Sequence, residues 1–600
     1  MKRNSVPTRS KPAVSDGGTP LMPPPGFVVA HRQSHRRGSA LLVVLVVVML
    51  LTLSAYTYTQ TMQTEFEAAV MHGQDIQARQ AADSGVEYAA MLLARRTSSS
   101  DVGLSQNPPL FQAIPVVETE RPGLRARFTI LTPAAGGVAG GQVRYGLADE
   151  SARLNLNLLN DLQKDLQLED EDISDWLLSI PGMTQETGDA IRDWIDEDQD
   201  KRPYGAESEA YQSRSPPYSA KNGPLESLDE LLLVQGVTAG LLYGEDANRN
   251  GLLDLNENDG EASPPLDNAD GVLNVGWTAY LTVNSRERNL RADGQPRINL
   301  NSGLLTDLYD QLEEAFDEDT AKFVIAYRMN GPTEVPADEN ADPNDVKNKK
   351  LKNNNSSNNG GSKGNSSGSS KKQQQQQTND NLQKLTQDLA KTMFQKGGQV
   401  TRGDMDLSKG GSTQIKSIYD LIGSQTTATA DGATTTLDSP WGADAGTLSS
   451  LLPKLVDTLS TTDDAYLQGR ININEARPEL LAGIPGMTAE VIQSVQAAQS
   501  RQAQGVPSAD VILKHSTTGW LLTDGLVDIA MMRELDPYLT ARGDVYRAQV
   551  LGFFEAGGPV HRQEAMIDAT RNPPRILWQR DLNELGRGYL KSHLMPVATP

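Results

Sequence analysis

The first strong pattern in the chain is an unbroken apolar stretch that leads into a longer helical periodicity. Residues 40–51 are all apolar, and with residues 52–58 the stretch reaches the roughly 20 residues that cross hydrocarbon as a helix. Apolar residues from Phe66 to Leu93 then recur near the helical period of about 3.6. We therefore predict one helix from about Ser39 to about Arg95, with its first half in lipid and its second half amphipathic.

Farther along, apolar and polar residues alternate in short segments, which is the pattern of half-buried strands. Three features are predicted from this alternation and from the Gly- and Pro-rich turns between the segments. They are a β-hairpin on the helix (124–130 and 143–147), a strand at 277–283, and a C-terminal meander (546–554, 560–567 and 576–578). Acid-rich residues with helical periodicity follow the hairpin, so the pattern predicts both helices and antiparallel strands.

One long segment cannot contribute to a core. Residues 347–379 contain no apolar residue beyond Leu351, and a chain of this composition cannot bury enough apolar surface to fold. Helical periodicity restarts at Leu382 and continues to Met393. The whole-chain composition agrees, because only 38% of the 600 residues are hydrophobic and 5% are aromatic.

Charge separates the N-terminal leader from the rest of the chain. Residues 1–38 carry +6, whereas the whole chain carries −22, so the remaining residues carry −28. Basic residues before an apolar span stay on the cytoplasmic side, which places everything after Tyr58 outside. A Sec signal peptide is the alternative, but no A-x-A-like site follows the apolar run and the helical pattern continues beyond it.

The acidic balance and the lack of cysteine exclude several classes of function. Phosphate neutralisation requires Lys and Arg, so a net charge of −22 argues against a protein that binds polyanions. Zero cysteines exclude disulfides, Cys-zinc sites, Cys-ligated iron–sulfur clusters and thiol catalysis. No Ser-His-Asp or H-E-x-x-H spacing nominates a hydrolytic nucleophile, so no enzyme is predicted.

Two families of short repeats recur along the chain. Segments 153–157, 297–301 and 470–474 each read Arg, then apolar residues alternating with Asn, and the simplest interpretation is capping, with Asn474 at the N-terminus of a helix near Glu475. Segments 178–184 and 482–488 both contain Ile-Pro-Gly-Met-Thr and resemble helix-hairpin-helix units. Thr replaces the second glycine that phosphate contact requires, and acidic residues lie behind the first unit, so a structural or protein-contact hairpin is favoured over a DNA-binding one.

The stretch from Asp246 to Glu257 fills the calcium-loop pattern D-x-[DN]-x-[DN]-G-x5-E without a mismatch. Gly251 permits the sharp turn, and Leu253 is expected to be the apolar anchor. The predicted Ca²⁺ ligands are the side chains of Asp246, Asn248, Asn250, Asp254 and Glu257 and the carbonyl of Leu252.

An acidic surface turn is the alternative to a calcium loop. A second hand and an exiting helix are missing from the sequence, so a permanently occupied structural site is expected rather than a sensor. A further acidic group, Asp196, Asp198 and Glu207, is expected to be a solvated face.

The N-terminus resembles the class III signal of type IV pilins and type II secretion pseudopilins. The shared features are a basic leader ending in Gly38, the small residue Ser39, the apolar stretch and its amphipathic continuation. The resemblance implies that a prepilin peptidase cuts between Gly38 and Ser39 and methylates the new terminus. The fifth position after this site is Val43 where most such proteins have Glu, and the K-type minor pseudopilin is the family that lacks the glutamate.

The chain as a whole resembles the general secretion pathway protein K family of the type II secretion system. Besides Gly38, Ser39 and Val43, the resemblance rests on residues 80–86, 193–196, 230–234 and 244–248. It implies an α+β fold, in which a pilin-like N-terminal helix packs on an antiparallel sheet interrupted by a large α-helical domain with helix-hairpin-helix-like units.

That resemblance also implies a function. The expected protein crosses the bacterial inner membrane once, has its body in the periplasm and lies at the tip of a short pseudopilus. There it binds the I-type and J-type minor pseudopilins, helps to start assembly and limits growth.

The rival interpretation is a membrane-anchored nucleic-acid receptor that uses the hairpins, although the protein K reading predicts no nucleic-acid partner. The expected organisation along the chain is as follows: a leader (1–38), the pilin helix (39–96), a hairpin region (97–150), a helical domain with the calcium loop (151–275), a strand and helical segment (276–345), a low-complexity insert (346–380), a second helical region (381–510) and a β-rich end (511–600).

Overall fold

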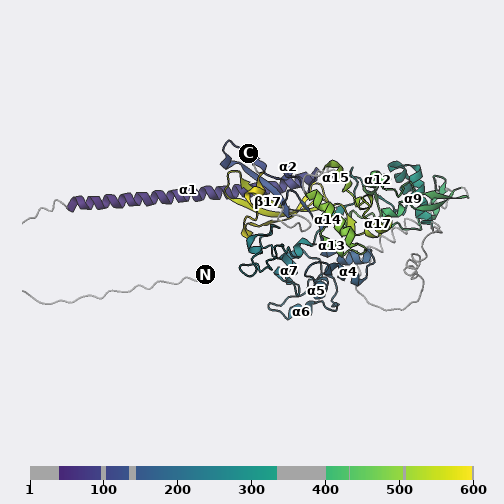
Figure 1. Cartoon of the computed structure of the whole chain (residues 1–600), viewed down its shortest axis with the longest axis horizontal. Helices are drawn as coiled ribbons and strands as arrows, with labels where there is room; N and C mark the ends of the chain where they lie inside the picture. The colour runs from purple at the N-terminus through teal and green to yellow at the C-terminus, as the bar shows by residue number, and fades with distance from the viewer. Residues whose placement is uncertain are drawn as a thin grey trace, which may run out of the picture. The chain divides into compact units, whose positions relative to one another are not determined.

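The computed structural model describes residues 39–95, 103–133, 143–333, 400–430, 433–503 and 508–596, which form two units divided after Val70. The first unit is the start of helix α1 (Ser39–Ala94), whose side chains are exposed from Ala40 to Val70. This helix is long and apolar enough to cross a membrane. It spans the residues that the periodicity predicts for one continuous helix (Figure 1).

The second unit contains a seven-stranded sheet built from both ends of the chain. Its main path runs β1 (Ile114–Val117), β2 (Ala126–Pro133), β17 (Val545–Phe554), β18 (Val560–Asp568), β19 (Arg575–Asp581), while β3 (Val143–Arg144) pairs with β2 and β4 (Ala148–Asp149) pairs with β17. Strands β2 and β17 are antiparallel neighbours, with Ile130 opposite Val550. The predicted meander is confirmed, and the predicted hairpin is confirmed in part, because only residues 143–144 of the strand expected at 143–147 are extended. The intervening helical residues are an insertion between two neighbouring strands.

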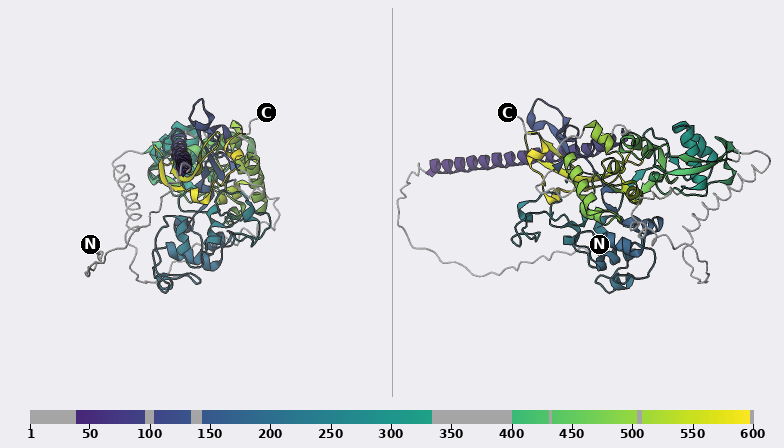
Figure 2. Two further views of the ribbon diagram at one scale, coloured as in Figure 1. Left: turned by 90° about the vertical axis from the view of Figure 1, so that its left-hand side faces the viewer. Right: turned by 45° about the vertical axis from the view of Figure 1, so that its right-hand side comes forward.

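The C-terminal half of α1 covers one face of this sheet. Val86, Ala89 and Leu93 pack against Phe128 and Val550 in one apolar cluster. The yellow C-terminal strands lie directly beside this part of the purple helix (Figure 2). A helix and a sheet approach this closely because glycine stands at both surfaces: a Cβ at Gly552 would collide with the backbone of Ala78, and one at Gly85 would collide with Val550.

The insertion is mostly helical and is built around the largest apolar core. Its helices are α3 (Leu159–Asp165), α4 (Asp170–Leu178), α5 (Gln185–Ile195), α6 (Ser208–Gln212), α7 (Ala239–Tyr243), α8 (Leu305–Ala315), α9 (Glu318–Asn330), α12 (Ala445–Thr458), α13 (Pro478–Ala482), α14 (Ala489–Ala503), α15 (Ala509–Lys514), α16 (Trp520–Thr523) and α17 (Ile529–Leu535). Short helices α2 (Pro108–Phe111) and α18 (Lys591–Leu594) flank the sheet strands, and 3-10 turns include η3 (Glu150–Ala152), η4 (Leu156–Leu158), η5 (Leu228–Leu233), η6 (Leu255–Glu257) and η7 (Trp277–Ala279). One core joins residues from Leu154 to Leu539.

Three short parallel strand pairs frame the helical insertion, and each begins at one of the Arg-and-Asn repeats. They are β5 (Leu154–Asn155) with β6 (Leu281–Thr282), β8 (Ile298–Asn299) with β13 (Leu459–Ser460), and β15 (Ile471–Asn472) with β16 (Leu539–Thr540). In each repeat the second Asn donates its side-chain N–H groups to two carbonyls, one of them on the residue just after the partner strand. The pairs of carbonyls are Leu225 and Val283 for Asn157, Ile415 and Thr461 for Asn301, and His515 and Ala541 for Asn474.

Two sequence-based assignments in this region are wrong. Asn474 does not cap a helix, because α13 begins at Pro478 with Arg477 as its N-cap, and the Asn474 side chain ties chain segments together instead. Only residues 281–282 of the predicted strand at 277–283 are extended. The preceding residues form η7, and the Trp277 indole donates to the Pro181 carbonyl at 2.9 Å, a long-range contact with no local signature.

The remaining strands are short hairpin pieces of the insertion. Strand β7 (Arg286–Arg288) pairs with β14 (Tyr466–Gln468), and a four-stranded sheet contains β9 (Thr401–Arg402), β10 (Met405–Asp406), β11 (Gln425–Ala430) and β12 (Ala433–Asp438). The predictions for the leader, the low-complexity segment and the helix restarting at Leu382 lie outside the described residues.

Candidate functional site

The residues predicted to bind calcium form one compact loop between α7 and η6. The Asp246 carboxylate accepts the backbone N–H of Asn250 at 3.0 Å. The Glu257 carboxylate accepts the backbone N–H groups of Ala247 at 3.0 Å and of Asp254 at 3.1 Å. The first and last positions of the motif thus hold the two ends of the loop together.

Asp254 gathers the amide side chains of the same loop. Asn248 Nδ2 donates to Asp254 Oδ2 at 2.6 Å, and Asn250 Nδ2 donates to the same oxygen at 3.0 Å. The backbone N–H of Leu252 donates to Asn250 Oδ1 at 2.6 Å. All six predicted ligand residues are therefore close together, although the cation itself stays a prediction.

The electrostatics of the loop fit a bound divalent cation. Glu257 and Asp246 are buried, at 1% and 9% exposure. Burial, together with the charges of Asp246 and Asp254, raises the pKa of Glu257 to about 7, and burial raises the pKa of Asp246. Among the described residues, none of these three carboxylates forms an ion pair with Lys, Arg or His. Hard oxygen donors are the set that Ca²⁺ takes, and the one cation that acts on them is Arg562, whose charge lowers the pKa of Asp246 by less than burial raises it.

The loop docks on the sheet through side chains that the motif does not contain. The buried Arg562 of β18 donates from Nη1 to the Asn248 carbonyl at 2.8 Å and from Nη2 to the Arg249 carbonyl at 2.7 Å. Gln549 of β17 donates to the Arg249 carbonyl at 2.7 Å. Arg562 and Gln549 were missed because a strand residue that supports a distant loop leaves no local signal in the sequence.

The apolar anchor of the loop is Leu252, not Leu253. Leu252 is buried in a cluster with Leu131, Leu551 and Phe553 of the sheet, whereas Leu253 is half-buried. The assignment of Leu253 is wrong because the loop turns the side chain of Leu252 toward the sheet. A loop from the helical insertion is thereby fixed to the sheet by apolar packing and by hydrogen bonds.

The second acidic group is more buried than a solvated face would be. Asp196, Asp198 and Glu207 can each place a carboxylate oxygen within 4.8 Å of the others, and Asp196 and Glu207 are 7% and 6% exposed. Only Asp198 is exposed, so the expectation of a solvated face is wrong for the other two. Arg202 pairs with Asp196 and, at 2.8 Å, with Asp193.

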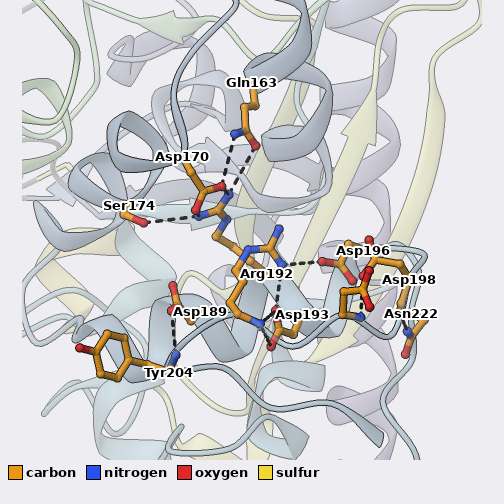
Figure 3. A network of polar contacts seen from close by, with 12 residues as sticks. Gln163, Asp170, Ser174, Asp189, Arg192, Asp193, Asp196, Asp198, Tyr204 and Asn222 are labelled. Carbon is orange, nitrogen blue, oxygen red and sulfur yellow. Dashed lines mark hydrogen bonds and ion pairs between the residues drawn. The ribbon is translucent and has the colours of Figure 1, made fainter. Parts of the chain in front are cut away.

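Figure 3 shows the polar network around this acidic group, with Asp193, Asp196 and Asp198 labelled. Neither carboxylate oxygen of Glu207 accepts a hydrogen bond from the described residues. Burial, followed by the charges of Asp193 and Asp196, raises the pKa of Glu207. Arg202 therefore pairs with Asp193 and Asp196, whereas Glu207 forms no ion pair with the described residues.

The two Ile-Pro-Gly-Met-Thr segments are tight turns between consecutive helices. Gly182 and Gly486 both adopt positive φ, at 75° and 84°, which explains the repeated glycine. Thr184 caps α5 by accepting the N–H of Thr187 at 3.3 Å. The first turn is held against η7 by the Trp277 indole, so a structural role accounts for it; its identity as a helix-hairpin-helix unit stays a prediction.

The predicted processing site lies at the edge of the described chain. Ser39 is the first residue of α1, and Gly38 lies outside the described residues. Val43 is 57% exposed on α1. Cleavage between Gly38 and Ser39 stays a prediction.

Three comparisons relate this chain to known proteins. Residues 152–243 match the family model described as type II secretion system (T2SS), protein K. The type II secretion system protein K of Klebsiella pneumoniae is 30% identical over 220 residues, which are 35% of this chain and 60% of that protein. The match thus spans less than two thirds of its relative.

A crystal structure of the GspK-GspI-GspJ complex from the enterotoxigenic Escherichia coli type 2 secretion system is also similar. The match covers 87% of this chain and 99% of the other chain, with 10% identity and a TM-score of 0.31. At that TM-score, the fold is established by the elements of this chain and not by the superposition.

Proposed function

We propose that this chain is a protein K of the type II secretion system, a minor pseudopilin at the tip of a periplasmic pseudopilus. The match of residues 152–243 to the protein K model carries the proposal. The apolar start of α1 supplies the single membrane anchor, and the helix-on-sheet body supplies the structural subunit. The proposed role is that of a structural subunit.

The helical insertion supports a terminal position in the filament. The chain leaves the sheet after β4 and returns to it at β17, so the insertion adds a whole helical domain to the subunit. A filament of stacked α1 helices requires each internal subunit to fit between neighbours above and below. A subunit of this width fits where one neighbour is absent, and such a subunit starts assembly and limits growth.

The partners proposed for this position are the I-type and J-type minor pseudopilins. Val43 supports an end position, because a buried glutamate in lipid needs a partner amine on a neighbouring subunit and Val43 needs none. A prepilin peptidase on the inner membrane would expose Ser39 as the first mature residue. The body after α1 then lies in the periplasm.

The experiment is complementation of a type II secretion strain that lacks its own protein K, with this chain expressed at native level. Restored export of a secreted enzyme and pseudopili of normal length are expected. Co-purification with I-type and J-type subunits and N-terminal sequencing of the detergent-extracted protein complete the test. A mature N-terminus other than Ser39 would refute the processing proposal. A correctly processed protein that fails to restore secretion would refute the functional proposal.

We further propose that the loop from Asp246 to Glu257 holds a structural Ca²⁺. If the dissociation constant lies at about 0.1–1 mM, as in extracellular modules, 2 mM calcium stabilises the fold by roughly 0.6–1.8 kcal/mol. EGTA should therefore lower the melting midpoint of the full chain in detergent. Glu257→Gln should abolish that calcium response, whereas Glu261→Gln, an exposed residue of the following segment, should retain it.

Calcium stoichiometry separates the loop from the second acidic group. One bound ion that disappears in Glu257→Gln assigns the site to the loop. A second ion that persists in that variant and is lost in Glu207→Gln assigns another site to Asp196, Asp198 and Glu207. Identical melting midpoints with calcium and with EGTA would refute the calcium proposal for both groups.

A further inference from the structure

Three Asn-Gly pairs lie within the described residues, and they differ in what holds the glycine nitrogen. They are Asn222-Gly223, Asn250-Gly251 and Asn330-Gly331. Two of them continue with proline, so residues 222–224 and 330–332 share the sequence Asn-Gly-Pro. A difference in reactivity between these two therefore comes from the fold and not from the tripeptide.

An asparagine side chain can react with the backbone that follows it. The backbone nitrogen of the next residue can reach the side-chain carbonyl carbon and close a cyclic imide. Glycine favours this closure, because it has no Cβ and its backbone is the most permissive. The nitrogen can attack only when its N–H is free, since a hydrogen-bonded N–H points at its acceptor.

The pair in the predicted calcium loop is held at both residues. The Gly251 N–H donates to Asp246 Oδ2 at 2.9 Å. The Asn250 side chain is 0% exposed and donates to Asp254 Oδ2 at 3.0 Å. A Cβ built at Gly251 would meet the Pro133 side chain at 2.5 Å, so the backbone has no room to turn. Ring closure here requires the loop to open.

The pair at the end of α9 is more accessible, but its nitrogen is also held. Asn330 is exposed and donates to the Thr427 carbonyl at 2.5 Å. The Gly331 N–H donates to the Tyr327 carbonyl at 2.8 Å at the C-terminus of the helix. Attack by this nitrogen must first break that bond and leave a helix carbonyl without its donor.

Neither restraint applies to Asn222-Gly223. The Gly223 N–H donates to no acceptor among the described residues. A Cβ built at Gly223 would meet only the Lys221 carbonyl, at 3.9 Å, so there is space around this backbone. The Asn222 side chain donates from Nδ2 to the Asp198 carbonyl, and its Oδ1 accepts no hydrogen bond from the described residues. Figure 3 shows Asn222 beside Asp198.

We propose that Asn222 deamidates spontaneously in the folded protein. The Gly223 nitrogen loses its proton to base and forms a bond to Asn222 Cγ, the bond from Cγ to Nδ2 breaks, and the amide nitrogen leaves as ammonia with a proton taken from water. Water then opens the cyclic imide at either carbonyl, which leaves aspartate or isoaspartate at position 222. Water is the only co-reactant, and nothing is oxidised or reduced.

The reaction changes the charge of the acidic group behind α5. The Asn222 amide donates to the Asp198 carbonyl, and a carboxylate cannot supply that donor. The new negative charge joins a group in which Asp196, Asp198 and Glu207 already place carboxylates close together. Deamidation therefore removes one contact of the segment before Pro224 and adds repulsion at the same place.

The test is residue-resolved peptide mapping of the full chain after incubation. The protein is kept in detergent micelles with calcium at neutral and mildly alkaline pH, and samples are digested at acidic pH and analysed by mass spectrometry at successive times. Asn222 should convert about fivefold or more faster than Asn330 and about tenfold or more faster than Asn250, since a hydrogen bond must first open at both of those sites. The rate at Asn222 should rise with pH, because base removes the proton of the attacking nitrogen.

Unfolding supplies the matched control. In urea the identical tripeptides at Asn222 and Asn330 should convert at similar rates, because the hydrogen bond of Gly331 is lost. Gly223→Ala should slow conversion in the folded and in the unfolded protein, because a Cβ hinders ring closure. After incubation the native protein should melt at a lower temperature than before, whereas Asn222→Ser, which cannot react, should keep its midpoint.

Two results of the mapping would overturn the proposal. They are an Asn330 that converts as fast as Asn222 in the folded protein, and an Asn222 that converts in urea but stays unmodified in the folded protein over the same time. An equal fall of the melting midpoint in native protein and Asn222→Ser would refute the effect on the acidic group. The comparison in urea uses the native sequence, so the proposal stays testable if a variant does not fold.

Discussion

Asp149 is the buried carboxyl through which the sheet and the helical insertion are joined, and its ionisation should make that junction sensitive to pH. It lies on β4 at 3% exposure. It accepts the N–H of Ser151 at 2.8 Å, the side-chain N–H of Asn472 at 2.7 Å and the N–H of Gly543. Replacing Asp149 by Asn removes the charge and keeps the size of the side chain.

The magnitude follows from the pKa. Burial, followed by the charge of Glu475, outweighs the three hydrogen bonds and raises the pKa of Asp149 from 3.8 to about 7. The folded state therefore holds a proton that the unfolded state has released between these two values. The contribution of Asp149 to stability is complete below about pH 4 and is lost as the pH rises toward 7, by up to about 4 kcal/mol at about 1.4 kcal/mol per pH unit.

The assay is urea unfolding of the full chain in detergent at closely spaced pH values from 4 to 8. Asp149→Asn should lower the slope of unfolding free energy against pH by up to about 1.4 kcal/mol per pH unit, whereas the contribution of Glu257, whose pKa is also raised to about 7, should remain. At pH 4 the variant should be less stable by about 1–3 kcal/mol, because an amide cannot accept all three hydrogen bonds. Asp463→Asn, at an exposed position, should keep the native slope. An unchanged slope in Asp149→Asn would refute the reasoning.

Three further predictions concern side chains that hold segments together. Arg562→Met should destabilise the fold by about 3 kcal/mol or more in thermal melts and weaken its calcium response, because two loop carbonyls lose a buried charged donor. Asn301→Ala should cost about 2–3 kcal/mol in urea unfolding, since the carbonyls of Ile415 and Thr461 lose their partner, whereas Asn330→Ala on the surface should cost less. Gly552→Ala should melt at a lower temperature than the native protein, because the added Cβ collides with the α1 backbone. Native-like stability of any of these three variants in its assay would contradict the argument for that variant.

The sequence predicts best where the signal is local. The long helix and the C-terminal meander follow from hydrophobic period, since apolar residues at a fixed spacing bury one face. The calcium loop is equally local because its ligands lie within twelve consecutive positions, Asp246 to Glu257. The helix and the meander adopt the structures that the pattern predicts, and calcium binding by the loop stays a prediction.

Long-range contacts account for what the sequence could not predict. Trp277 reads as part of a strand, but its indole bonds to Pro181 and the chain turns there instead. The sheet-facing role of Leu252 and the support from Arg562 depend on which strand passes beneath the loop. A pocket between the sheet and the helical insertion is lined by residues from Leu131 to Arg580, so no short segment of the sequence could predict it.

The three short parallel strand pairs hold segments that are distant in sequence next to one another, so the helical segments between them can differ while the sheet stays the same. Each repeat fixes two distant segments by a parallel pair and an Asn side chain, so the helices between them need not maintain that connection. The low-complexity sequence lies between β8 and β13, the two strands of the second pair, after α9 and before β9 along the chain. Its flanks are held independently, because Thr426 donates to the Gly331 carbonyl at 2.7 Å and Arg328 bonds to the Thr413 carbonyl. Added length between fixed ends costs little, since loop-closure entropy grows only with the logarithm of length. A change in the length of this segment should therefore leave the sheet and the calcium loop intact.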